Sequence, residues 1–298
     1  MYNKIKTALT QGLSSYQIKL IALFFMTIDH IGIHSYKIPG LVAYRNLMRG
    51  LGRIAAPLFL FMVIESARHT KDRKRFLRRL YLAGVGMGLF TSITNLLSTL
   101  IIKTSSSPGN IFYTFFFTVL YIYLIEAVIK AVKERNGRNA LKSAACFLLT
   151  FVPTVFFIFF EGKIRLAVFE ASNQNYVLMN FVGDLFEAVL PEPLGVDYSC
   201  IFVLMGILMY FAKTKIPQCA VFAAFCALCY VSAAVNFTPL SSFYGTGTQH
   251  WMILALPFML LYNGKRGAEH KAFFYLYYPL HYLVIYAIST AIETVFIP

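Results

Sequence analysis

The stretch that decides the fold runs from residue 18 to residue 36 and reads IKLIALFFMTIDHIGIHSY. It is long and apolar enough to cross a bilayer as a helix, which takes roughly 20 residues. Its later half nevertheless contains Asp29 and His30 side by side, and His34 follows one turn after His30 on the same face. An Asp at the centre of a membrane helix costs roughly 2.5–3.5 kcal/mol on insertion scales. We therefore expect these side chains to have a function or a partner inside the protein.

The composition of the whole chain is that of a membrane protein. Of its 298 residues, 58% are hydrophobic and 13% are charged, whereas soluble domains contain about 25% charged residues. The net charge of +14 lies mostly in short segments between apolar runs. No polar domain offers a basic face, so we expect no nucleic acid among the partners. The five cysteines lie in apolar runs or at their edges, where cysteine usually behaves as a small hydrophobe.

Apolar runs along the chain predict an all-α, polytopic bundle of transmembrane helices. They lie at about 17–36, 51–68, 79–101, 110–130, 141–160, 197–213, 216–234, 248–263 and 272–291, which gives about nine spans, with eight and ten as the limits. No repeat or soluble segment divides them, so we treat 1–298 as one membrane domain. We expect the first run to remain as a helix rather than to be a cleaved signal peptide, because it is long and further spans follow it.

Charge placement predicts the orientation of the bundle. The basic segment between the second and third runs contains Arg68, Lys71, Arg73, Lys74, Arg75, Arg78 and Arg79, whereas 235–247 contains no charged residue. The positive-inside rule then places the N-terminus inside and the C-terminus outside. The predicted outer segment 161–196 is mostly acidic. Its apolar residues between 176 and 190 have helical spacing, which suits an interfacial or re-entrant helix.

The polar residues of the first run allow three interpretations. His30 could hold neighbouring helices together through a hydrogen bond. His30 and His34 could bind a metal ion, although no third ligand is evident and we expect no metal site. The third interpretation is acid–base chemistry or proton movement, for which an imidazole beside an acid is well suited.

Further ionisable residues lie in other spans. Arg53 follows Gly50-Leu51-Gly52 at the predicted outer end of the second span, where it could pair with Asp29, hold an anion or extend to the headgroups. Glu65 lies at the other end of that span, where pairing with the basic segment explains it. His281 follows Pro279 in the last span, and a Pro often marks a break that lines a cavity. The first and last spans can thus bring two imidazoles together, with helix packing as the competing explanation.

The chain resembles the TraX family of bacterial integral-membrane proteins, which is related by fold to transmembrane acyltransferases. The resemblance covers nearly the whole chain and rests on the following motifs, in order: Ile28-Asp29-His30-Ile31-Gly32, Gly52-Arg53-Ile54, Pro57-Leu58-Phe59, Glu65 with His69-Thr70, Asn110 with Thr114, Tyr262-Asn263-Gly264-Lys265-Arg266-Gly267, and Tyr278-Pro279-Leu280-His281. It implies a multi-pass protein of the bacterial cytoplasmic membrane, linked to conjugation through N-terminal acetylation of pilin. Asn110 is also a plausible helix cap.

The same resemblance implies an acetyl- or acyltransferase. Its donor would be acetyl-CoA or another acyl-CoA, and its acceptor a protein N-terminus or a cell-envelope molecule. His30 would act as the general base, oriented by Asp29, while Arg53 and His281 would stabilise the oxyanion. The phosphates of coenzyme A would lie against Arg68, His69, Arg73, Lys74, Arg75 and Arg78, although the positive-inside signal alone also explains this basic segment. The remaining polar candidates are His34, Glu65, Asn110 and Thr114.

Two other classes of function remain open. A proton-coupled transporter of small molecules would also place Asp29, His30, Glu65 and His281 inside a helix bundle. Against a transporter, the sequence shows no inverted repeat and no matched pair of broken helices. A non-catalytic membrane assembly factor is the other alternative. In every case the lipid bilayer is a partner.

Overall fold

The computed structural model describes residues 12–38, 40–102, 109–235, 248–268 and 270–296. Across these ranges the chain is helical, and the one bridge of strand type pairs Leu13 with Tyr262. The predicted all-α class is therefore confirmed. By their contacts the helices form two compact units: unit 1 comprises Met1–His69 and Leu208–Pro298, and unit 2 comprises Thr70–Ile207.

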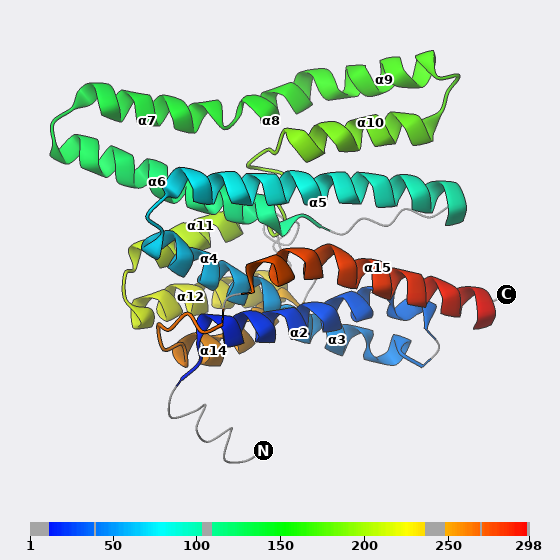
Figure 1. The fold of residues 1–298 in the computed structure, drawn as a ribbon, viewed down its shortest axis with the longest axis horizontal. Helices are drawn as coiled ribbons and strands as arrows, with labels where there is room; N and C mark the ends of the chain where they lie inside the picture. Colours follow the sequence, from blue (N-terminus) through cyan, green and yellow to red (C-terminus); the bar gives the residue numbers. More distant parts are fainter. Residues whose placement is uncertain (1–11, 39, 103–108, 236–247, 269, 297–298) are drawn as a thin grey trace. The chain divides into compact units, whose positions relative to one another are not determined.

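Unit 1 is built around the first long helix, α2 (Ser15–His34), which contacts α3 (Arg45–Gly52), α4 (Ala55–His69) and α15 (Lys271–Phe296) (Figure 1). Ser14 caps its start, because its hydroxyl accepts from the Gln17 amide while the Gln17 side chain accepts from the Ser14 amide. Leu23 and Met26 pack against Ala55 in a core that aromatic side chains of α15 complete. Unit 1 also contains the end of α11 (Ser199–Phe211), α12 (Lys215–Ala234), the 3₁₀ helix η4 (Gln249–Ala255) and α14 (Leu256–Leu260).

Unit 2 consists of antiparallel helices. They are α5 (Arg73–Ile102), α6 (Ile111–Lys133), α7 (Gly137–Leu149), α8 (Val152–Phe156), a π-helical turn (Phe157–Glu161), α9 (Gly162–Ala171) and α10 (Tyr176–Val189), followed by the first part of α11. Figure 1 shows α10 lying between α5 and α9. Gly88 on α5 allows this close approach, since a Cβ there would be 2.8 Å from the backbone of Ala188. The Tyr81 hydroxyl ties the end of α10 by donating to the Val189 carbonyl at 2.8 Å.

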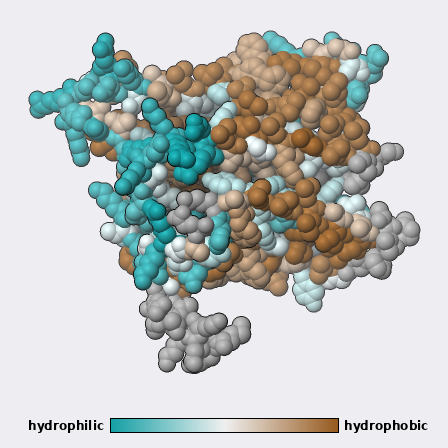
Figure 2. Space-filling view, viewed as in Figure 1, coloured by the Kyte–Doolittle hydropathy of each residue, from teal (hydrophilic) through white to brown (hydrophobic). Residues whose placement is uncertain are grey.

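Seven of the described helical segments are long and apolar enough to cross a membrane: Ser15–Lys37, Val42–His69, Arg73–Leu100, Ile111–Lys133, Gly137–Ala171, Lys215–Ser232 and Ala272–Glu293. The apolar segments Ser199–Phe211 and Gln249–Leu260 are shorter. In unit 2, hydrophilic residues cover the turn from α6 to α7 and the turn from α9 to α10, and hydrophobic residues cover the helices between them (Figure 2). This distribution is that of membrane helices with polar ends. The count of nine spans and their orientation stay predictions.

One helix end and one expected break differ from the sequence prediction. The fifth span was predicted to end at residue 160, before the first charge, yet the helix continues to Ala171. It continues because Arg165 lies one turn after Glu161 and pairs with it at 2.7 Å. The break expected at Pro279 is also absent, since α15 continues as a helix through this residue. A Pro is tolerated in a membrane helix when other groups satisfy the backbone that it frees.

Candidate polar site between helices α2, α3 and α15

The centre of the site is an ion pair between α2 and α3. Nη1 of Arg49 donates to Oδ2 of Asp29 at 2.7 Å, and the side chains are 20% and 11% exposed. Glycines allow the two helices to meet here: a Cβ on Gly52 would overlap Asp29, and one on Gly32 would lie 2.9 Å from Met48. Both charges of the pair thus compensate each other in a largely buried position.

Arg53, the expected partner of Asp29, lies at the break between α3 and α4. It is buried, with 8% of its surface exposed, and is close enough to act electrostatically on Asp29. The salt bridge itself is formed by Arg49, one helical turn earlier, which the sequence analysis did not single out. Arg49 faces α2 because the glycines bring the two backbones together.

His30 and His281 meet beside this pair. Their ring centroids are 4.7 Å apart, and Tyr282 lies edge-on to His30 with its ring centroid at 5.7 Å. Nδ1 of His281 lies 2.8 Å from the carbonyl of Tyr277. A carbonyl only accepts, so Nδ1 carries the proton and, in the neutral ring, Nε2 presents a lone pair. The structure therefore brings together the two imidazoles that the sequence placed in different spans.

The polar contacts continue along both helices. His34 lies edge-on to Tyr282 and Tyr286 with ring centroids 5.7 Å away in each case. Beyond it, Nζ of Lys37 pairs with Glu293 at 2.8 Å and lies 5.4 Å from the Tyr286 ring centroid. We call this row of side chains the polar stripe; it comprises His30, His34 and Lys37 on one side and Tyr278, His281, Tyr282, Tyr286, Thr290 and Glu293 of α15 on the other.

Six buried atoms of the polar stripe make no hydrogen bond with any residue that the structure describes: Nδ1 of His30, both ring nitrogens of His34, Nε2 of His281, the Tyr286 hydroxyl and Oγ1 of Thr290. A buried polar atom without a partner costs about 1–3 kcal/mol. Together these atoms would cost roughly 6–18 kcal/mol, as much as the whole net stability of a typical protein, about 5–15 kcal/mol. The polar stripe therefore offers six hydrogen-bonding positions to a partner beyond the described residues. Among the described residues, no three His, Cys, Asp or Glu side chains converge on a possible metal position.

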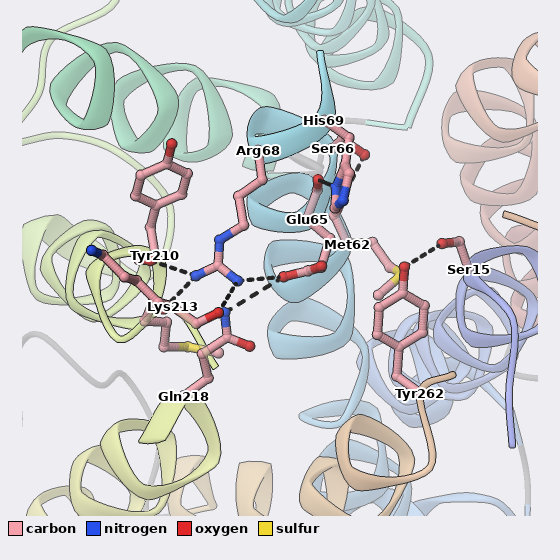
Figure 3. A network of polar contacts seen from close by, with 11 residues as sticks. Ser15, Met62, Glu65, Ser66, Arg68, His69, Tyr210, Lys213, Gln218 and Tyr262 are labelled. Carbon is pink, nitrogen blue, oxygen red and sulfur yellow. Dashed lines mark hydrogen bonds and ion pairs between the residues drawn. The ribbon is translucent and has the colours of Figure 1, made fainter. Parts of the chain in front are cut away.

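Arg68, expected to bind coenzyme A, caps the end of α11 (Figure 3). Its guanidinium donates to Oε1 of Glu65 at 2.8 Å and to the carbonyls of Met209, Tyr210 and Lys213. Gln218 donates to the same Glu65 oxygen at 3.5 Å. A cation at the C-terminus of a helix satisfies its last carbonyls and its dipole. Arg68 is thus already occupied by protein acceptors.

The other basic candidates have different surroundings. Nδ1 of His69 lies 2.8 Å from the Glu65 carbonyl. In unit 2, Arg73 pairs with Glu126 at 2.7 Å, while Lys74, Arg75 and Arg78 are exposed. Binding of acyl-CoA at this segment stays a prediction.

Asn110 and Thr114 belong to unit 2 and form a second small polar cluster. Asn110 precedes α6 but makes no capping bond through its side chain, which donates instead to the Gly84 carbonyl at 2.8 Å. Thr114 donates to the carbonyl of Asp197 at 2.7 Å. Burial raises the pKa of the Asp197 carboxyl to about 6, against a smaller lowering by the Asn110 amide. Asp197 was not among the residues singled out from the sequence, where it falls at the edge of an apolar run.

Comparisons with known proteins agree with the resemblance seen in the sequence. The model of the TraX protein family matches residues 14–154 and 141–289. The probable fimbrial assembly protein FimC, serogroup H1, of Dichelobacter nodosus is 23% identical over 90% of this chain and 92% of its own length. An uncharacterized protein of Rickettsia prowazekii, RP591, is 28% identical over 57% of this chain and 76% of its own length. No solved structure matches the chain.

These matches correct the expectation of an acetyl- or acyltransferase. The relative aligned over nearly its full length is named for fimbrial assembly, and none of the matching names refers to acyl transfer. The structure gives a physical reason in the same direction, because the guanidinium of Arg68 is bound by a carboxylate and three carbonyls rather than available for phosphates. The matched residues cover most of the sequence, and the chain belongs to the TraX protein family.

Proposed function

We propose that this protein is a non-catalytic membrane factor for the assembly of a cell-surface protein filament. The observation that supports this most is the likeness to a probable fimbrial assembly protein over 90% of this chain and 92% of that protein. A likeness over nine-tenths of both chains concerns most of the membrane body rather than one shared segment. The predicted orientation, with its basic segment inside, favours the bacterial cytoplasmic membrane.

The polar site of unit 1 is where such a factor would engage its partner. Filament subunits that leave the cell must pass through or out of the membrane, and any polar group they carry then needs hydrogen bonds that lipid does not offer. The site supplies both kinds of group within apolar helices. Its charges come from Asp29 and Arg49, and its ring nitrogens from His30 and His281. Intramembrane ionisable residues commonly mark a functional pathway because they are expensive to keep there. We assign the binding of a polar group of the subunit to this site.

The test uses a bacterium that carries this gene, with the gene deleted and then restored on a plasmid. We expect deletion to remove surface filaments in electron micrographs and to leave the filament subunit in the membrane fraction. Asp29→Asn should restore few or no filaments although the protein is present at its normal level on immunoblots. The matched control is Glu170→Gln, the same chemical change at an exposed position of α9. Full filament assembly in the deletion strain would overturn the proposed function.

A further inference from the structure

We infer that the polar stripe between α2 and α15 is a water-filled path that connects the Lys37–Glu293 end of unit 1 with Asp29 and His30 in the middle of the helices. This inference is independent of the assembly role, because it concerns what solvates these side chains whichever partner the protein has.

The geometry of the two helices carries the first step. Along α2 and the 3₁₀ helix that follows it, η1 (Ser35–Lys37), the polar residues are spaced by four and three positions, at 30, 34 and 37. On α15 they are spaced by about one turn, at 278, 282, 286, 290 and 293. These spacings keep each series on one face of its helix. The ring contacts of His30 with Tyr282 and of His34 with Tyr286 show that the two faces meet.

The second observation is that buried nitrogen and oxygen atoms of the polar stripe lack hydrogen-bond partners among the described residues. They lie all along the polar stripe, from Nδ1 of His30 and Nε2 of His281 to Oγ1 of Thr290. At about 1.5 Å per residue, the distance from His281 to Glu293 along the helix is about 18 Å, too long for one small ligand to serve every position.

The chemistry of these atoms favours water. Nε2 of His281 accepts, the hydroxyls of Tyr286 and Thr290 both donate and accept, and each neutral ring of His30 and His34 has one donor and one acceptor. Water satisfies both kinds of group and occupies buried sites where it finds two to four polar partners. Polar groups at membrane depth are tolerated where they line a hydrated cavity. The ion pair of Lys37 and Glu293, with the Glu293 side chain 37% exposed, marks the end that opens to solvent.

Thiol accessibility tests the path. In a variant whose five native cysteines are replaced by serine or alanine, single cysteines are introduced as Thr290→Cys, Tyr286→Cys and His281→Cys. The controls are Val284→Cys and Ile288→Cys, on exposed apolar positions of the same helix. The protein is made in a bacterial host without the filament genes, so that no subunit can occupy the site. Membrane-impermeant methanethiosulfonates are then applied to each face of the membrane in separate vesicle preparations.

Because only a thiolate in contact with water reacts, the cysteines of the polar stripe should label at least about tenfold faster than the controls. They should do so from one face only, with Thr290→Cys, nearest the solvent end, the fastest. Equal, slow labelling of Thr290→Cys and Ile288→Cys would overturn the path, and so would labelling from both faces. Thr290→Cys is nearly isosteric, so this comparison remains decisive if the larger substitutions disturb folding.

Discussion

Loss of Arg49 should destabilise unit 1 more than loss of any exposed arginine in the same helix. Arg49→Met leaves the carboxylate of Asp29, whose side chain is 11% exposed, without its salt-bridge partner. Breaking a buried ion pair by removing one partner costs about 3–5 kcal/mol. Both side chains retain some exposure, so we expect about 3 kcal/mol. Arg45→Met is the control, because Arg45 is an exposed residue of the same helix, and it should cost less than about 0.5 kcal/mol.

The double variant Asp29→Asn with Arg49→Met separates the pair from the general effect of substitution. Removing both charges should recover at least about half of the loss, because the uncompensated carboxylate is gone. Unfolding by SDS in mixed micelles can be followed through Trp251, the one tryptophan of the chain, whose ring would be 2.7 Å from a Cβ on Gly50 and so reports on this region. The reasoning is refuted if Arg49→Met costs no more than Arg45→Met, or if the two single losses simply add.

Three further substitutions have defined outcomes. Gly52→Ala should destabilise by about 1–3 kcal/mol in the same unfolding assay, because its Cβ would overlap Asp29. Arg68→Met should expose the end of α11 to proteolysis, since its carbonyls lose their capping donor; an unchanged cleavage pattern would contradict this. Burial raises the pKa of Asp197 to about 6, so the folded state holds this proton more tightly than the unfolded chain. Its stabilising contribution is present below about pH 4 and should be lost as the pH rises through about 6, by up to about 3 kcal/mol, and Asp197→Asn should abolish that loss.

The helices could be predicted from the sequence because a chain in lipid must satisfy its backbone internally. An apolar run of about 20 residues that is not part of a barrel can satisfy its backbone hydrogen bonds in lipid only as a helix. The end of a helix was harder to predict where charges compensate each other. The charge of Glu161 predicted the end of the fifth span. Arg165, one turn later, neutralises this charge and also pairs with Glu187 at 3.0 Å, so the helix continues.

The site was only partly predictable, because a sequence gives the spacing along one helix and not the rotation of one helix against another. Asp29, His30 and His281 were identifiable as ionisable residues inside apolar runs. Arg49 was not, since it precedes the expected start of the second span and faces α2 only because Gly32 and Gly52 allow close contact. The aromatic side chains of the polar stripe could not be singled out from the sequence, because the chain contains 19 Tyr and 29 Phe residues throughout its length.

The central claim is that the polar site of unit 1 engages a filament subunit. It is tested most directly by replacing Tyr282, which contacts both His30 and His34, with p-benzoylphenylalanine and irradiating cells that are assembling filaments. The same substitution at Phe24, an exposed position of α2, is the control. We expect a covalent adduct with the filament subunit from position 282 and none from position 24. Filament assembly at the normal level without any adduct at position 282 would contradict the claim.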